Sequence, residues 1–582
     1  MRLPEQYDCF KEIWAIDFEF NDVDGNRPHV VCLVARELRT GRLVRLFEDN
    51  VGPLPPYSCG PESLVVAYFA TAELDCHLSL GWPLPLNVLD LYVEFRALRN
   101  GLPNGPGGRG LLGALIHFGL DHIRADAKDH WRELIIAGGS FDAQQRQGIL
   151  DYCQTDVDAL ASLLPKMADS IDLPQALYRG QYMAATSRMQ HAGVPIDVEA
   201  FKRLQTYWSD IRLDLINRID TAGVFEGESF RQTRFVDYLM KEDIPWPRLP
   251  SGILDLKTET FRAMAKLYPQ IAPLHELRHT LSQMRQIKLA VGHDGRNRCL
   301  ISPFGASTSR NTPQASRFIF GPSAWLRSLI KPRPNAGIAY LDWSQQEIAI
   351  AAALSGDENM IEAYDSGDFY LSFAKQAGAV PSWGTKASHK RERDLYKTCA
   401  LGVQYGLQEQ SLALRLELPV VYARQLLQAH KRTYAQFWRW QDQVADAAFL
   451  KLKIKSVFGW PLTISSQANP RSVRNFPMQA NGAEMLRLAT IALQQAGITV
   501  CAPVHDAVLI EAPLDQFDET VAQAKLVMEK ASLAITNGKV KVRVDADVVK
   551  WPERYVDERG WRMWSVVDEL TGQLSGNNPA GQ

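Results

Sequence analysis

The sequence lacks the features that mark a secreted or membrane-bound protein. Its eight cysteines are scattered and include no CxxC pair, which indicates reduced thiols without a structural zinc site. The N-terminus has no apolar signal segment, and no apolar run is long enough to span a bilayer. Internal repeats and low-complexity segments are missing too, apart from a loose tail over 574–582. These absences predict a cytoplasmic protein with no membrane partner.

An excess of charge of one sign is also missing. The 582 residues carry 64 Lys and Arg against 66 Asp and Glu, a formal charge of −2. A basic groove can still exist on a neutral protein, because local patches rather than the total charge attract phosphates. The chain is too long for one hydrophobic core, and a hydrophobic content of 46% is ordinary for globular proteins. We therefore expect several domains.

One short stretch, 339–347, organises the rest of the chain. The apolar run 338–341 predicts a buried strand that ends at Asp342, and an alanine-rich helical pattern follows over 348–354. A carboxylate at the end of a buried strand is costly unless a metal or another cation receives it. An alternative interpretation makes Asp342 the N-cap of the following helix. This stretch alone leaves both interpretations open.

The first 165 residues place acidic side chains on predicted strands and helices. The alternating stretch 13–20 predicts a strand with Asp17 and Glu19 on the same face, where they repel one another unless a cation lies between them. Asp75 lies in a helical stretch, and the i, i+4 spacing of Tyr152 and Asp156 puts them on one face of a later helix. Each acid taken alone is more commonly a solvated surface group.

As a set, these residues resemble the three motifs of the DEDD 3′→5′ exonucleases. The resemblance covers roughly residues 10–165 and implies that two divalent metal ions are held by Asp17, Glu19, Asp75 and Asp156. It also implies that Tyr152 orients the attacking water. Two carboxylate-bound cations suit phosphodiester hydrolysis, because they hold the attacking and leaving oxygens in line. The family has His-Asn shortly before the second-motif Asp, whereas this chain has Ala-Thr there.

The middle of the chain, from about 173 to 291, is rich in helical periodicity and shows no catalytic pattern. Helices are predicted over 179–193, 198–222, 230–241 and 258–291. An all-α connecting domain is the simplest interpretation of this segment.

Two stretches in the C-terminal half combine with the strand-end acid Asp342. On a predicted helix, residues that recur every four positions share a slowly turning face: Arg393, Lys397, Leu401 and Tyr405. Two cations with an apolar and an aromatic residue suit a triphosphate at one end and a base at the other, although basic residues on helices are usually only solvated. The stretch 500–510 predicts a hairpin with an acid, Asp506, at its tip.

The order of these stretches resembles the family A DNA polymerases, the group of bacterial DNA polymerase I and many phage replicases. Asp-Trp-Ser-Gln-Gln-Glu at 342–347 is similar to motif A, residues 393–406 to motif B, and Val-His-Asp at 504–506 to motif C. The resemblance spans about 180–560. Three positions depart from the family pattern: Tyr370 stands at the His of an Ile-His pair, Leu401 replaces an aromatic residue, and Ala507 replaces a Glu.

The resemblance implies roles for the matching residues. Asp342 and Asp506 hold two Mg²⁺ ions, for which Mn²⁺ is a substitute. Arg393 and Lys397 neutralise the triphosphate, and Lys397 protonates the leaving pyrophosphate. Glu347, braced by Tyr405, blocks a ribose 2′-hydroxyl, and Leu401 lies near the incoming base. Contacts with DNA are implied for Arg310, Arg471, Asn475, Gln479 and His505.

Together the two resemblances imply a multidomain α/β and α fold. A ribonuclease H-like exonuclease domain is expected over 1–172, the thumb and the entrance to the palm over 173–335, and the palm over 336–582 with fingers inserted at about 356–490. The start of the exonuclease similarity near residue 10 leaves no room for a 5′-nuclease domain before it. The expected partners are primer-template DNA and dNTPs, and the expected state is a monomer. A processivity factor, helicase or primase is not indicated either way.

The function expected is that of a DNA-directed DNA polymerase with 3′→5′ proofreading that replicates a phage or plasmid genome in the host cytoplasm. The departures at Tyr370, Leu401 and Ala507 leave two alternatives open: an exonuclease or repair protein with a degenerate polymerase half, and a non-catalytic DNA-binding subunit. They also raise the hypothesis of a pocket adapted to a modified purine such as 2-aminoadenine. Primer extension with Mg²⁺ and dNTPs separates the three functions.

Overall fold

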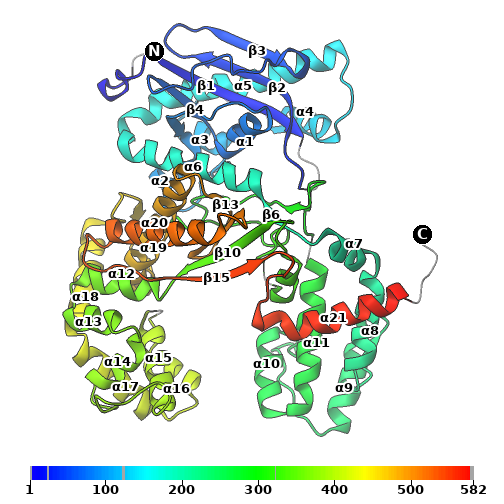
Figure 1. The fold of residues 1–582 in the computed structure, drawn as a ribbon, viewed down its shortest axis with the longest axis vertical. Helices are drawn as coiled ribbons and strands as arrows, with labels where there is room; N and C mark the ends of the chain where they lie inside the picture. Colours follow the sequence, from blue (N-terminus) through cyan, green and yellow to red (C-terminus); the bar gives the residue numbers. More distant parts are fainter. Residues whose placement is uncertain are drawn as a thin grey trace.

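The computed structural model describes residues 3–21, 25–120, 125–286, 288–321, 323–404 and 406–576. A first lobe of sheet and helices lies above a central sheet, and two helical lobes extend below that sheet on opposite sides (Figure 1). The multidomain α/β and α class predicted from the sequence is therefore confirmed.

The first lobe is built on a five-stranded sheet of order β3-β2-β1-β4-β5. The strands are β1 (Glu12–Asn21), β2 (His29–Glu37), β3 (Leu43–Phe47), β4 (Ser63–Ala67) and β5 (Val88–Asp90). Strands β1 to β3 are antiparallel, whereas β4 runs parallel to β1 and to β5. The helices are α1 (Thr71–Ser79), α2 (Leu91–Arg99), α3 (Leu111–His117), α4 (Ala125–Ala137) and α5 (Ala143–Met167). Because α5 packs on β1 and β2, strand β1 is buried as its apolar residues require.

Helix α6 (Leu173–Ala192) joins the first lobe to the central sheet. It packs against α1 and β5 on one side and against β13 (Thr499–Val504) and α19 (Pro470–Gln495) on the other. At Gly180 a Cβ atom would lie 1.9 Å from the carbonyl oxygen of Val88, so only glycine permits this close approach. The neighbouring Arg179 forms a buried bidentate ion pair with Glu94, with both N···O distances 2.7 Å. One hydrophobic core therefore continues across the boundary predicted at 172/173.

The central sheet has the order β13-β14-β10-β15, and its neighbouring strands are antiparallel. The strands that join β13 are β10 (Ala336–Trp343), β14 (Ala507–Pro513) and β15 (Val544–Lys550). Helix α20 (Phe517–Ile535) packs across β10, β14 and β15, and α19 packs against β13 and α12 (Gln346–Ser355). The strand predicted at 338–341 and the hairpin predicted over 500–510 are both confirmed.

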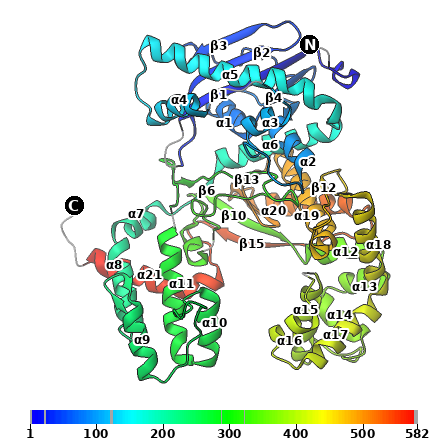
Figure 2. The ribbon, with the colours of Figure 1, turned by 180° about the vertical axis from the view of Figure 1, so that it is seen from behind.

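One helical lobe contains most of the predicted connecting segment. Its helices are α7 (Val198–Thr206), α8 (Trp208–Ile219), α9 (Gln232–Lys241), α10 (Thr258–Leu267) and α11 (Ala272–Gln286). The single helices predicted over 198–222 and 258–291 are each two helices, broken at Tyr207 and at the Pro269 turn. The last helix, α21 (Glu558–Gly576), returns to this lobe and buries its apolar face there (Figure 2). The segment 336–582 therefore also contributes α21 to the lobe that α7–α11 build.

The other helical lobe is inserted between α12 and α19. It consists of α13 (Glu358–Asp365), α14 (Phe369–Gln376), α15 (Lys390–Gln404), α16 (Glu409–Leu416), α17 (Val420–Thr433), α18 (Ala435–Lys451) and the hairpin β11 (Lys453–Lys455) and β12 (Pro461–Thr463). The insertion starts close to the predicted residue 356. Helix α19 already belongs to the central layer, so the lobe ends before the predicted residue 490.

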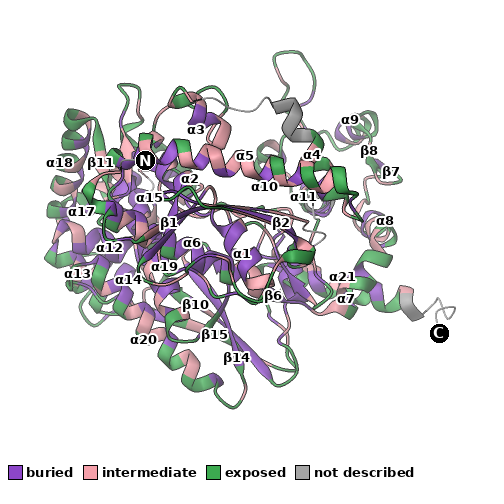
Figure 3. Ribbon diagram, turned by 90° about the horizontal axis from the view of Figure 1, so that it is seen from above, coloured by how far each residue is buried: buried purple, intermediate pink, exposed green. Residues whose placement is uncertain are grey.

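The most buried elements lie at the centre of the molecule. Purple, buried segments run along β1, α6, α19 and β14, whereas green, exposed segments lie on outer helices such as α4 and α20 (Figure 3). Among the described residues, no helix combines the length and apolar character needed to cross a membrane.

Candidate active sites

The first acid set lies on β1 where that strand passes under α5. Ligand atoms of Asp17, Glu19 and Cys153 all lie within 4.8 Å of one another. The Cys153 thiol donates to the backbone oxygen of Asp17 at 3.3 Å and to its carboxylate at 3.2 Å. A register shift in the pairing of β1 with β2 follows directly after Glu19. The expectation that Asp17 and Glu19 lie on one face of a strand is confirmed.

Tyr152 and Asp156 of α5 lie beside these two acids. Burial, followed by the charges of Glu19, Asp156 and Asp17, raises the pKa of the Tyr152 phenol. The phenol therefore stays protonated at neutral pH and can donate a hydrogen bond. Helix α5 and strand β1 thus bring four of the five predicted residues of this set together.

Helix α1 contributes a different acid from the predicted one. Glu73 is buried and its carboxylate accepts a hydrogen bond of 2.8 Å from the backbone N–H of Phe18. Burial, followed by the charge of Asp17, raises the pKa of Glu73 well above its usual range. The predicted Asp75 lies two residues later, where its carboxylate meets Nδ1 of His191 at 2.9 Å. Because residues i and i+2 of a helix do not share a face, only Glu73 joins Asp17.

A buried aspartate fixes the start of α1. The Asp90 carboxylate accepts hydrogen bonds from the N–H groups of Phe69 and Ala70, just before α1, and also caps α2. Burial raises the pKa of Asp90 to about 6 in spite of these donors. Phe69 has a φ of 71°, a strained value that this anchoring stabilises. The turn thereby directs Glu73 toward β1.

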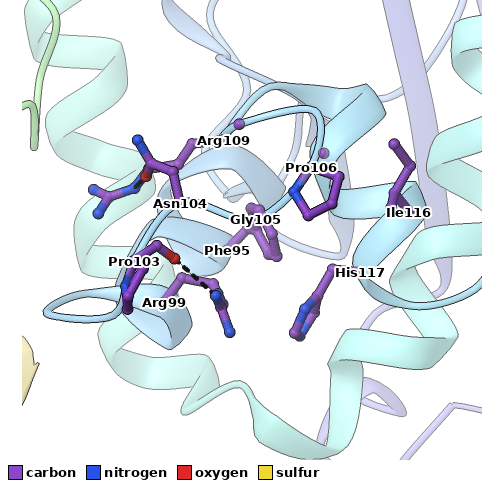
Figure 4. A pocket seen from close by; sticks show the side chains of 11 residues that line it. Phe95, Arg99, Pro103, Asn104, Gly105, Pro106, Arg109, Ile116 and His117 are labelled. Carbon is purple, nitrogen blue, oxygen red and sulfur yellow. Dashed lines mark hydrogen bonds between the residues drawn. The ribbon is translucent and has the colours of Figure 1, made fainter. Parts of the chain in front are cut away.

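A small cavity elsewhere in the first lobe is separate from this acid set. It lies between α2, α3 and the connecting loop and is lined by residues such as Phe95, Pro106 and His117 (Figure 4). Its volume of about 40 Å³ is close to the space of one water molecule, and no carboxylate lines it. This cavity is too small to hold a nucleotide.

The second acid set lies at one end of the central sheet. Asp342, near the end of β10, is directly opposite Ala507 of β14, and Asp506 precedes Ala507 in the turn. Asp342 is exposed to solvent. Desolvation by the surrounding protein, followed by the charges of Asp506 and Asp545, nevertheless raises its pKa to about 6. The alternative of Asp342 as a helix N-cap is wrong, because Gln345 occupies that position before α12.

Arg310 connects the second acid set to α12. Its guanidinium lies 2.7 Å from Glu347 and 3.3 Å from Asp506. These residues and His505 line a cavity of about 670 Å³, which is large enough for a nucleotide. The expected brace for Glu347, Tyr405, lies outside the described residues, so Arg310 is the partner that the structure gives to Glu347.

A buried arginine that the sequence did not single out supports the Arg310 loop. Arg487 of α19 is 1% exposed, pairs with Glu484 at 3.0 Å and donates two bonds of 2.8 Å to Ser309, one to the backbone oxygen and one to the hydroxyl. The amide of Asn311, two residues after Ser309, donates a hydrogen bond to the Tyr182 hydroxyl of α6. An Arg within the largely apolar stretch Met485–Leu493 of α19 was the available signal for this role.

Helix α15 presents the predicted cationic face. Arg393 is held by Asp368 at 2.6 Å, and the Tyr370 ring lies 5.5 Å from the Arg393 guanidinium and 5.8 Å from the Lys397 ammonium. Leu401 follows on the same helix and is half-buried. The structure therefore brings three of the four predicted residues onto one helix, and the fourth, Tyr405, lies outside the described residues.

The predicted DNA contacts lie on α19 and at the β13–β14 turn. Asn475 and Gln479 are half-buried in the first half of α19, and Arg471 is exposed at its start. A Cβ atom at Gly406, just after α15, would lie 2.5 Å from Cγ of Arg471. The start of α19 therefore contacts the chain that follows α15. His505 is exposed at the turn with a φ of 56°.

Both acid sets have donors that fit divalent cations. Their side chains supply carboxylate oxygens, the ligands that Mg²⁺ prefers. In the second set, desolvation and then the charges of Asp506 and Asp545 raise the pKa of Asp342, and a bound cation would offset both effects. The residues that could hold such cations are Asp17, Glu19, Glu73 and Asp156 in the first set and Asp342 and Asp506 in the second.

Comparisons with known proteins agree on one family. A sequence model of DNA polymerase family A matches residues 320–552. DNA polymerase I of Chloroflexus aurantiacus is 25% identical over 373 residues, which cover 58% of this chain and 39% of that protein. The DNA polymerase of Mycobacterium phage L5 is 26% identical over 313 residues, 52% of this chain and 49% of that protein. The matches thus span half or less of these relatives.

A solved structure shares the fold. The POL domain of Pol1 from M. smegmatis, in complex with DNA primer-template and dNTP, superimposes with a TM-score of 0.72 at 17% identity. The match covers 92% of this chain and 94% of that one, so the likeness in fold extends through the first lobe, the central sheet and both helical lobes.

Proposed function

We propose that this chain, which belongs to DNA polymerase family A, extends a primer on a DNA template from dNTPs and removes 3′-terminal nucleotides at a second site. The observation that supports synthesis most strongly is the pair Asp342 and Asp506 at one end of the central sheet, beside a nucleotide-sized cavity that Arg310 and Glu347 line. The first lobe corresponds to the exonuclease, α7–α11 with α21 to the thumb, the central sheet to the palm and α13–α18 to the fingers.

In the polymerase site, each group acts on a particular part of the reactants. The carboxylates of Asp342 and Asp506 would hold divalent metal, on which family A polymerases generally depend; Mg²⁺ bound there would lower the pKa of the primer hydroxyl and stabilise the phosphate charge. Arg393 and Lys397 bind the triphosphate, and Lys397 gives a proton to the leaving pyrophosphate. Tyr370 keeps the two cations on one side of α15 before a nucleotide binds.

Selection against ribonucleotides is assigned to Glu347. Its carboxylate lies beside the nucleotide-sized cavity and is held by Arg310 at 2.7 Å. A fixed side chain excludes an added 2′-hydroxyl because it cannot move aside, and a hydroxyl placed against it loses its hydration.

The proofreading site uses the first acid set with one change from the sequence-based expectation. Glu73 replaces Asp75, so the metal-holding residues are Asp17, Glu19, Glu73 and Asp156. Tyr152, neutral because of its raised pKa, orients the attacking water by donating from its hydroxyl. The Cys153 thiol holds the Asp17 carboxylate in place.

Base preference is a finer part of the proposal. Leu401 is half-buried on α15, Tyr370 is buried beside Arg393 and Lys397, and Ala507 is fully buried opposite Asp342. These three departures from the family pattern support the hypothesis that the nucleotide pocket selects a modified purine. Single-nucleotide incorporation opposite template T, comparing dATP with its 2-amino analogue with and without the first acid set, tests it. Equal efficiency in both backgrounds contradicts an adapted pocket.

The proposed origin follows from one of the relatives. The relation to a phage DNA polymerase supports replication of a phage genome in a host cytoplasm. The chain is proposed to act as a monomer.

Primer extension tests the proposed function. The full chain, Mg²⁺, the four dNTPs and a primer-template with a 5′ overhang should give a full-length product, and a single strand without dNTPs should be shortened from its 3′ end. Shortening without extension supports the degenerate-polymerase alternative, and DNA binding with neither activity supports the non-catalytic subunit.

A further inference from the structure

A carboxylate on the edge strand of the central sheet lies directly beside Asp342. Strand β10 is flanked by β14 and β15, and the residues opposite Asp342 are Ala507 on one side and Asp545 on the other. Directly opposed residues of antiparallel strands point to the same face, with Cβ atoms about 5 Å apart. Asp545 therefore projects from the sheet next to Asp342, while the other neighbour contributes only a methyl group.

The position of the Asp545 side chain is fixed by Ser344. The Ser344 hydroxyl donates a hydrogen bond to the Asp545 carboxylate. Ser344 is itself held on both sides, because its N–H donates to the Arg543 carbonyl at 2.9 Å and its carbonyl accepts from the Tyr364 hydroxyl at 2.9 Å. A serine two residues after Asp342 thus ties the loop that follows β10 to the acid on β15.

We infer that Asp545 is a third metal-binding carboxylate of the polymerase site, oriented by Ser344. The inference rests on the proposed function of Asp342 and Asp506. Three carboxylates from β10, the β13–β14 turn and β15 surround the end of the sheet, and carboxylate oxygens are the ligands with which proteins hold two divalent cations at a site of this kind. Strand β14 places Ala507, which has no carboxylate, opposite Asp342. Strand β15, on the other side of β10, supplies a carboxylate instead.

Asp547 provides a matched control on the same strand. It lies two residues after Asp545, on the same face, but opposite Tyr340 rather than Asp342. Asp545→Asn and Asp547→Asn therefore remove the same charge from one face of β15 at two distances from Asp342. Asparagine also retains an oxygen that accepts from Ser344, so the local fold is preserved in the first variant.

The test uses the full chain with two readouts. Extension rate is measured against Mg²⁺ concentration, and Mn²⁺ binding is measured by the electron paramagnetic resonance of the free ion, with the first acid set unchanged in every variant. We expect Asp545→Asn to raise the half-saturating Mg²⁺ at least about tenfold and to weaken Mn²⁺ binding, while Asp547→Asn changes either by less than about twofold. Asp545→Glu should recover part of the Mn²⁺ affinity.

Three results overturn the inference: wild-type values for Asp545→Asn, equal effects of Asp545→Asn and Asp547→Asn, or slower extension by Asp545→Asn with unchanged Mn²⁺ binding. Failure of the proposed function is distinguishable from these, because the wild-type chain would then extend no primer at any Mg²⁺ concentration.

Discussion

Arg310 sets the charge balance of the polymerase site at the scale of single residues. It is shared between Glu347 and Asp506, so one cation partly neutralises a proposed gate residue and a proposed metal ligand. Arg487 and Ser309 hold the loop that carries it. A change at Glu347 therefore affects both the space near C2′ of the sugar and the availability of Asp506.

Two substitutions separate the shape of Glu347 from its charge. Glu347→Ala opens space and should raise the use of rNTPs relative to dNTPs about tenfold. Glu347→Gln keeps the volume and an oxygen that accepts from Arg310 but loses the charge, so it should keep the sugar preference while raising the Mg²⁺ requirement. Single-nucleotide incorporation of matched rNTP and dNTP measures the ratio. An unchanged ratio in the alanine variant removes Glu347 from the gate role.

The acid of α1 gives a prediction for proofreading. Glu73→Gln should reduce 3′ degradation of single-stranded DNA by about 100-fold or more, because it removes a carboxylate beside Asp17. Asp75→Asn, two residues away and paired with His191, should reduce it by less than about tenfold. The two variants are compared on one labelled oligonucleotide. A larger loss from Asp75→Asn would restore the assignment made from the sequence.

The choice between Glu73 and Asp75 shows where sequence reasoning stops at this scale. Acid spacing on β1 and α5 was sufficient to find Asp17, Glu19, Tyr152 and Asp156, because strand and helix periodicity fix which residues share a face. On α1 the acids at 73 and 75 point to different sides, and only the turn anchored by Asp90 decides which side faces β1.

At the scale of elements, helix α17 buries an ionisable ring. His430 is 2% exposed, packs among Phe373, Tyr434 and Phe437, and accepts a hydrogen bond from the Trp438 indole at Nδ1. Burial lowers the pKa of His430 from 6.5 to about 3. The native lobe therefore keeps this ring neutral at pH values where the unfolded chain protonates it.

This burial predicts a pH dependence of stability. Below pH 6.5 the unfolded state binds a proton that the native state does not, so the free energy of unfolding falls as the pH falls, by about 1.4 kcal/mol per pH unit down to a pH of about 3. His430→Phe removes this contribution, so its urea midpoint should change less between pH 7 and pH 5 than that of the wild type. Equal changes in the two proteins would contradict a neutral buried His430.

Elements with strong local signals were predictable, whereas pairings between distant segments were not. The run 338–341 and the polar tip of the hairpin at 504–507 predicted β10, β13 and β14 correctly. The long helical patterns hid breaks at Tyr207 and Pro269, since amphipathic periodicity continues across a short turn. The register that places Asp545 opposite Asp342 joins residues about 200 positions apart, and no local pattern reports it.

At the scale of the whole molecule, the two helical lobes meet at their tips. Lys266 at the end of α10 lies 2.9 Å from Glu417, which ends α16, and both side chains are exposed. Both helical lobes lie beneath the central sheet (Figure 1), and this exposed ion pair connects them there. A duplex bound beside Asp342 and Asp506, as proposed, would lie between the two lobes, and the ion pair would then help to retain it.

Charge reversal tests whether this contact matters. Lys266→Glu or Glu417→Lys should shorten the run of nucleotides added per binding event by about twofold, because like charges separate the tips. The double variant should restore the wild-type run length, and the difference should shrink in high salt, which screens exposed charges. Product lengths under single-encounter conditions give the measurement. Single variants with wild-type run lengths would show that the contact has no role in retention.

The central claim is that one chain carries two separate metal-dependent sites, one in the first lobe and one on the central sheet. Asp342→Ala and Asp17→Ala, assayed side by side for primer extension and for 3′ degradation, test it most directly. Asp342→Ala should lower extension at least about 1,000-fold and leave degradation intact, and Asp17→Ala should do the reverse. A single substitution that abolishes both activities, or two substitutions that leave both unchanged, would contradict the account.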